Sequence, residues 1–193
     1  MEVTCAILSG GRSRRMGHDK ATARVGGKTL VKHVYDVARR VFREIIVVSS
    51  LHRAFEGVEA AVVEDVLPWP GSLTGIVSAL IHGGTPYVFV LGCDLPFVTE
   101  EAIRYTLGES RGEDITIPRT EGGFEPMHAI YGRSCISPML TAIERREMKV
   151  SAIFPLLSVR VLLPNPVFFN RGMSVFTNVN TEEALKHAER LLL

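Results

Sequence analysis

Apolar and polar positions follow two different periods along the first 107 residues of the chain. Short, largely apolar runs, typical of strands buried on both faces, occur at 3–8, 44–48, 60–63 and 87–91. Between them, apolar residues recur at helical spacing from about Thr29, after Ser72 and from Thr99, and Ser72 and Thr99 are expected to cap their helices. Alternating strands and helices predict a three-layer, doubly wound α/β fold with a mostly parallel sheet.

The second half of the chain is less regular. We expect strands at 114–118, 127–131 and 159–163, of which 127–131 is the candidate antiparallel strand. Residues 119–124, with two adjacent glycines, predict a mobile loop, and a helix is expected over 137–147. A final helix follows Asn180, which is a candidate cap because Glu183 stands three residues further on.

Residues 8–20 lie between the first strand and the first helix and read Leu-Ser-Gly-Gly-Arg-Ser-Arg-Arg-Met-Gly-His-Asp-Lys. The adjacent Gly10 and Gly11 allow a sharp turn that presents backbone N–H groups to a ligand. Residues 1–28 hold six basic groups and two acidic ones, whereas the whole chain carries a net charge of +1. Such local charge predicts a phosphate site at the carboxyl edge of the sheet. The alternative is a solvated basic loop.

Two common phosphate-binding motifs are excluded by the spacing of this stretch. The adjacent glycines lack the G-x-G interval of a dinucleotide fingerprint. The lysine is followed by alanine and stands three residues after Gly17, so the stretch is not a P-loop.

Two carboxylates follow predicted strands. Asp94 comes directly after the strand 87–91 in the sequence Gly-Cys-Asp-Leu-Pro, and Mg²⁺ prefers one or two carboxylates together with phosphate oxygens. We therefore predict that Asp94 is a metal ligand; the alternative, a cap of the next helix, suits Thr99 better. Asp65 ends another strand and is a candidate to contact a nucleotide or share the metal, or else a simple turn residue.

Composition narrows the cellular setting. The three cysteines are far apart, odd in number and without a C-x-x-C pair, which argues for a reducing cytoplasm and against a disulfide scaffold or structural zinc. No apolar run approaches the ~18 residues needed to cross a bilayer, and no signal-peptide pattern is present. We therefore expect a cytoplasmic protein.

The stretch 8–20 resembles the L-x-G-G-x-S-x-R-M-G-x-D-K signature of nucleotidyltransferases, especially the molybdenum cofactor guanylyltransferases. Further segments are similar to that family's motifs in the same order, at 64–75, 92–97, 125–131 and 176–183. The chain departs from the family at 49–51, where Ser-Ser-Leu replaces Ser-x-Asn, and at Thr181, which is followed by Glu and not Pro. Residues 145–150 follow only loosely the family's Arg-rich acceptor region.

The resemblance implies a Rossmann-like nucleotidyltransferase fold and a set of site residues. It implies that GTP is contacted by Leu8, Ser9, Gly10, Lys20, Asp65 and Asp94, with Mg²⁺ on Asp94. We place the phosphates at Gly10, Gly11, Arg15 and Lys20, with Arg15, Lys20 and Asp94 as the catalytic groups. The resemblance further implies that Asn178 and Asn180 face the pterin acceptor.

One domain is expected over residues 1–193, with a nucleotide-binding half at about 1–107 and an acceptor-binding half at about 108–193. The implied reaction transfers GMP from GTP to molybdenum-bound molybdopterin and releases pyrophosphate. Expected partners are these substrates and molybdoenzymes or other cofactor-synthesis proteins, but neither nucleic acid nor membrane. Two alternatives stay open: a CTP-dependent or sugar-phosphate nucleotidyltransferase, and a non-catalytic cofactor carrier. Lys20 and Asp94 favour an enzyme, because a carrier needs neither.

Overall fold

The computed structural model describes residues 2–10, 23–49 and 54–192. Its main sheet contains β1 (Val3–Leu8), β4 (Ile45–Val48), β5 (Ala61–Val63), β6 (Tyr87–Gly92), β7 (Ile115–Thr120), β8 (Gly123–Phe124), β9 (His128–Gly132) and β10 (Val159–Leu162). The helices are α1 (Leu30–Ala38), α2 (Ser72–His82), α3 (Glu100–Glu109), α4 (Ile136–Glu144) and α5 (Glu182–Leu192). Short 3₁₀ turns are η2 (Arg133–Cys135), η3 (Val150–Leu156) and η4 (Pro166–Phe168).

The order of strands across the sheet is β10-β7-β9-β6-β1-β4-β5, with β8 paired to β7. The pairs β6–β1, β1–β4, β4–β5 and β7–β10 are parallel, whereas β9 is antiparallel to both β6 and β7. The predicted doubly wound, mostly parallel sheet with an antiparallel strand in the second half is thus confirmed.

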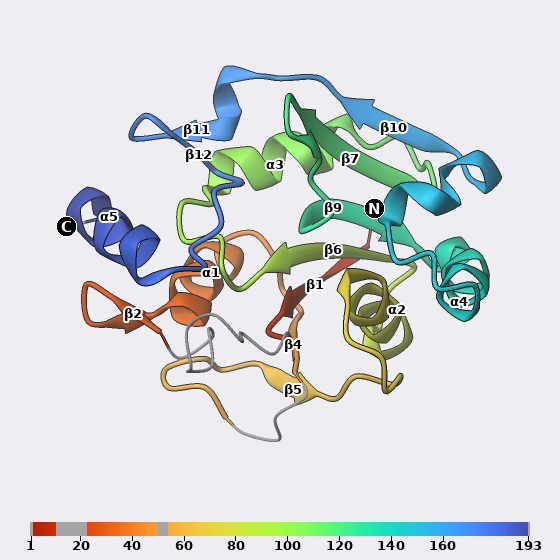
Figure 1. The fold of residues 1–193 in the computed structure, drawn as a ribbon, viewed down its shortest axis with the longest axis horizontal. Coiled ribbons are helices and arrows are strands. Elements are labelled where there is room, and N and C mark those ends of the chain that lie inside the picture. The colour runs from red at the N-terminus through yellow and green to blue at the C-terminus, as the bar shows by residue number, and fades with distance from the viewer. Residues whose placement is uncertain (1, 11–22, 50–53, 193) are drawn as a thin grey trace.

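Helices cover both faces of the sheet (Figure 1). Ala6 and Leu8 of β1 pack into the core under α2 and α4, whereas Cys5 and Ile7 pack into the core under α1. Residues of α3 join that second core. Because both faces are buried, the central strands appear in the sequence as largely apolar runs. Within the described part of the chain, no helix is long and apolar enough to cross a membrane.

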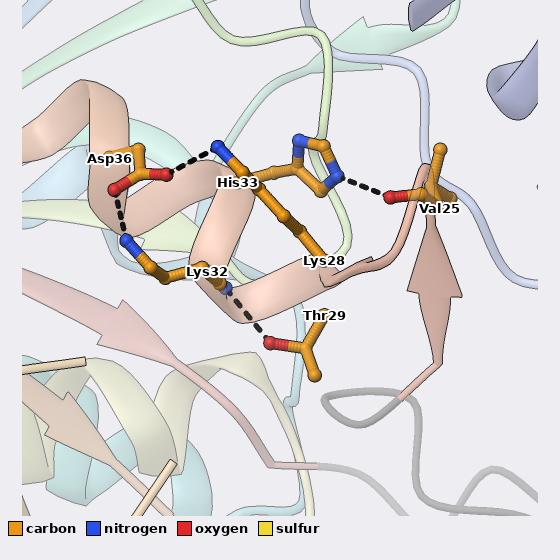
Figure 2. Close-up of polar contacts among 6 residues, drawn as sticks. All are labelled: Val25, Lys28, Thr29, Lys32, His33 and Asp36. Atoms are coloured by element: carbon orange, nitrogen blue, oxygen red, sulfur yellow. Dashed lines mark hydrogen bonds and ion pairs between the residues drawn. The ribbon is translucent and has the colours of Figure 1, made fainter. Parts of the chain in front are cut away.

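Two hydrogen bonds stabilise the start of α1. Figure 2 shows Thr29 accepting a hydrogen bond from the Lys32 N–H at 3.3 Å, as a helix cap does. His33 Nε2 lies 2.9 Å from the carbonyl oxygen of Val25, which holds the small sheet of β2 (Arg24–Val25) and β3 (Lys28–Thr29) against the helix.

Two of the six basic groups counted near the N-terminus have acidic partners. Lys28 Nζ lies 3.1 Å from Asp36, which also contacts Lys32 (Figure 2). Arg24 forms an ion pair with Glu56. The charge that suggested an anion site therefore rests on the four cations at 12–20, outside the described residues.

Several local predictions were wrong. Residues 119–124 form the β7–β8 hairpin, in which Thr120 pairs with Gly123 across a two-residue turn. Gly123 has a positive φ of 125°, which glycine accommodates, and Phe124 packs edge-on against Phe154. Ser72 lies inside α2, whose N-cap is Gly71. The helix expected at 137–147 is shorter, at Ile136–Glu144, and follows a 3₁₀ turn.

Candidate functional site

The strand ends converge on the carboxyl edge of the sheet. The Cys93 N–H donates to the Leu8 carbonyl at 3.1 Å, and the Ser9 N–H donates to the Val48 carbonyl at 2.8 Å. These bonds extend the parallel ladders one residue beyond the strands. The residues next in the chain, Gly10 and Asp94, therefore begin at one edge, as the sequence predicted.

Asp65 faces Gly10 on the α2 side of this edge. A Cβ atom added to Gly10 would lie 3.5 Å from Asp65 Oδ2, an ordinary van der Waals distance. Asp65 Oδ1 accepts a hydrogen bond from Ser78 Oγ at 3.1 Å. Burial raises the pKa of the half-buried Asp65 carboxyl group, and the Ser78 bond opposes that shift. Asp65 and Gly10, which are both predicted to contact the nucleotide, therefore lie next to each other.

Asp94 has space because glycine stands two residues before it. A Cβ at Gly92 would lie 2.8 Å from Asp94 Oδ1 and 3.2 Å from Met127 Cβ, so any larger residue would displace one of them. The cap of α3 is Thr99, whose Oγ1 accepts from the Ala102 N–H at 3.1 Å. The alternative in which Asp94 caps that helix is thereby excluded.

The asparagines proposed for the acceptor lie next to Asp94. The N–H of Val179, between Asn178 and Asn180, donates to the Asp94 carbonyl at 2.9 Å. The expected cap role of Asn180 was wrong: Thr181 Oγ1 accepts from the Ala184 N–H at 3.1 Å, and the Thr181 carbonyl accepts from Leu185. Asn180 is therefore not needed to begin α5.

No group of three or more His, Cys, Asp or Glu side chains suited to a metal occurs in the described part of the chain. A single carboxylate, Asp94, at the predicted phosphate-binding edge still fits Mg²⁺, which keeps several waters and takes its remaining ligands from phosphates. Gly11, Arg15 and Lys20 lie outside the described residues, so their placement stays a prediction.

Sequence reasoning missed Ser78, which is fully buried and contacts Asp65 from thirteen residues away. It also missed that Ser9 is buried, with an Oγ that has no hydrogen-bond partner among the described residues. A serine among the apolar residues of a helix was the available signal for Ser78, since a buried hydroxyl needs a partner.

Comparison with known proteins identifies the family. A model described as the MobA-like NTP transferase domain matches residues 5–156. The chain belongs to this family. A "Probable molybdenum cofactor guanylyltransferase" of Pelotomaculum thermopropionicum is 32% identical over 97% of this chain and 92% of that protein. A "Molybdenum cofactor guanylyltransferase" of Desulfosudis oleivorans is 30% identical over 97% of this chain and 94% of that protein.

Solved structures agree with this assignment. The molybdopterin-guanine dinucleotide biosynthesis protein A of Archaeoglobus fulgidus matches with a TM-score of 0.82 and 30% identity, covering 100% of this chain and 98% of that one. The 2-C-methyl-D-erythritol 4-phosphate cytidylyltransferase of Thermus thermophilus matches with a TM-score of 0.70 at 16% identity, covering 100% and 99%, and this shows the shared fold alone. By family and by fold, the chain is thus a nucleotidyltransferase. The family resemblance inferred from its sequence motifs is confirmed.

Proposed function

We propose that the protein transfers GMP from GTP to molybdenum-bound molybdopterin, forming the guanine dinucleotide cofactor and pyrophosphate. The observation that carries this proposal is the meeting of three segments at one sheet edge. They are Gly10 with Asp65, Asp94 at the end of β6, and the 178–180 segment bonded to Asp94. One edge thus joins candidate donor, metal and acceptor residues. The names of the full-length relatives supply the identity of the substrates.

Each part of this edge has a role in the proposed reaction. Backbone groups at Leu8, Ser9 and Gly10 and the Asp65 carboxylate bind the nucleoside, since they are fixed by the strand ends. Gly11, Arg15 and Lys20 bind the phosphates and neutralise charge that develops during transfer. Asn178 and Asn180 bind the pterin.

Asp94 would hold Mg²⁺, and the metal, when bound, neutralises phosphate charge. The terminal phosphate oxygen of the acceptor forms a bond to the α-phosphorus of GTP. The bond between that phosphorus and the bridging oxygen breaks, and pyrophosphate leaves with the electron pair. The attacking oxygen is already anionic, so the protein supplies no base and acts by positioning and charge neutralisation.

The direct test is a panel of GTP, CTP and ATP with Mg²⁺ and molybdopterin, in which pyrophosphate release is measured. We expect release with GTP that requires the pterin acceptor. Release with CTP but not GTP would retain nucleotidyl transfer and reject the guanylyl assignment. Binding of finished cofactor without turnover of any triphosphate would favour a carrier. Omission of Mg²⁺ tests the metal separately.

A further inference from the structure

The hydroxyl group of Ser78 lies where α2 meets the segment that follows β5. Ser78 is fully buried. Its Oγ lies 3.1 Å from Asp65 Oδ1, accepts from the Val66 N–H at 3.0 Å and lies 2.9 Å from the Thr74 carbonyl. One hydroxyl thus ties the Asp65 side chain and the next backbone N–H to the helix.

The single proton of this hydroxyl has two acceptors within reach. The lone pairs of Oγ take the Val66 N–H, so the O–H points either at Asp65 or at the Thr74 carbonyl. An ionised carboxylate is the stronger acceptor, because charge-assisted hydrogen bonds are the stronger kind. The ionised form of Asp65 is therefore the one that Ser78 holds.

Packing of α2 against β1 sets the position of this hydroxyl. A Cβ added to Gly75 would lie 3.0 Å from Leu8 Cδ1, so a glycine at this position lets the helix approach the end of β1 closely. Gly75 is three residues before Ser78 and thus lies on the neighbouring helical turn. The same close approach brings the Ser78 hydroxyl to Asp65.

The two oxygens of Asp65 are thereby distinguished. Ser78 holds Oδ1, whereas Oδ2 lies on the side of Gly10 and has no hydrogen-bond partner among the described residues. We propose that Ser78 is a positioning residue that aims Asp65 Oδ2 at the nucleoside bound beside Gly10. This inference rests on the proposed nucleotide-binding function of the edge.

A purely structural role makes a different prediction, because the Val66 and Thr74 contacts alone would satisfy a buried hydroxyl. The test therefore measures GTP affinity, turnover and melting on the same variants. Ser78→Ala is expected to weaken GTP binding about tenfold, the typical effect of losing a hydrogen bond to a charged group, with kcat at saturating GTP changed less than about threefold. GTP affinity is measured by isothermal titration calorimetry on each variant.

The matched control is Thr106→Ala, which also removes a buried hydroxyl group. Thr106 Oγ1 lies 3.2 Å from His128 Nε2, on the opposite face of the sheet from α2. We expect a lower melting temperature in this variant with unchanged GTP affinity. If Ser78→Ala lowers the melting temperature similarly but leaves GTP affinity unchanged, the proposal is overturned. Ser78→Cys, which keeps a weak donor, should give an intermediate affinity and serves if the alanine variant does not fold.

A double-mutant cycle with Asp65→Asn gives the decisive comparison. If Ser78 acts through Asp65, adding Ser78→Ala to Asp65→Asn should cost less than about twofold further GTP affinity. Full additivity of the two losses would overturn the positioning role. Wild-type protein that binds GTP normally while the cycle is additive rejects this inference alone. Wild-type protein that binds no GTP rejects the proposed function as well.

Discussion

The two carboxylates of the candidate site are placed by opposite means. Asp65 follows β5, an edge strand of the sheet, and the buried hydroxyl group of Ser78 in α2 is hydrogen-bonded to one of its carboxylate oxygens. Asp94 follows β6 in the centre of the sheet, where absence of a side chain at Gly92 makes room for its carboxylate and its own carbonyl accepts from Val179. A hydrogen-bond donor thus orients the carboxylate of Asp65, whereas the space left by Gly92 and a backbone hydrogen bond contribute to the placement of Asp94.

This contrast fits two different tasks. An oxygen fixed by a donor presents a defined acceptor, which suits recognition of a nucleoside. A carboxylate at the junction of the parallel strands and the 178–180 segment lies where the proposed donor phosphate and acceptor would meet. We therefore expect changes around Asp65 to alter which nucleotide binds and changes around Asp94 to alter turnover.

The largest effect is expected for Asp94→Asn, which keeps the size of the side chain and removes its charge. Loss of the proposed Mg²⁺ ligand should reduce kcat about 1,000-fold, equivalent to about 4 kcal/mol of transition-state stabilisation. Steady-state pyrophosphate release measures this, with melting curves to show that the fold is intact. Near-normal turnover would reject Asp94 as the metal ligand.

A second prediction asks whether Lys20 makes a specific contact with the nucleotide phosphates. Lys20→Ala should reduce kcat/KM about 100-fold, as loss of a phosphate-binding donor does. Arg24→Ala is the control, because Arg24 is half-exposed and paired with Glu56, and we expect less than about a threefold change. Equal losses at both positions would indicate general electrostatic attraction and not a specific contact.

Sequence patterns predicted the placement of both carboxylates but not what holds them. An apolar run ending in a polar residue, as at Leu91 and Asp94, marks a strand end, and parallel strands bring such ends to one edge. The Ser78–Asp65 contact joins residues thirteen positions apart and depends on how α2 packs against the sheet. The local pattern of apolar residues does not predict that packing. Asn180 and Thr181 are both good cap residues, and only the backbone path selects between them.

Stability on the Asp94 side should depend on pH through His128, which pairs with Leu91 at the end of β6 and packs against Phe168 and Phe176. Burial lowers the pKa of His128 to about 4 from 6.5, an effect only partly opposed by the Ala102 backbone. Between these values the unfolded chain binds the proton and the folded chain does not, so stability falls as pH drops from 6.5 to 4.

Denaturant unfolding at pH 7 and pH 5 measures this effect. The wild type should lose on the order of 2 kcal/mol more than His128→Leu, which cannot titrate. The titratable groups that the two proteins share cancel in this difference. Identical losses would show that His128 does not control the pH dependence of stability.

Gly92→Ala tests whether the space left by Gly92 is needed to position Asp94. The added methyl group would lie 2.8 Å from Asp94 Oδ1, so we expect the carboxylate to move and kcat to fall about tenfold. Gly108→Ala is the control, because Gly108 lies in α3 with no atom near its added Cβ. That substitution should leave kcat unchanged and stabilise the protein by up to about 1 kcal/mol. Unchanged kcat in Gly92→Ala would show that the backbone relaxes to accommodate the methyl group.

The smallest change is expected for a substitution that alters base preference on the Asp65 side of the site. Guanine presents an acceptor at O6 and donors at N1 and N2. In the proposed site the Gly10 backbone and Asp65 Oδ2 would bind these groups, because the Leu8 carbonyl and the Ser9 N–H are already bonded to Cys93 and Val48. A site built from hydrogen bonds discriminates strongly, so we expect wild-type kcat/KM to favour GTP over CTP and ATP by at least about 100-fold.

Gly10→Ala should therefore reduce the preference for GTP about fivefold, the effect of one misplaced methyl group. The protein itself tolerates that methyl, which would lie 3.5 Å from Asp65 Oδ2, so the loss arises from crowding of the bound purine. The measurement is kcat/KM for each triphosphate with both proteins, together with melting curves. An equal loss for every nucleotide would mean that the alanine disturbs phosphates shared by all three, and Gly10 would then not determine base choice.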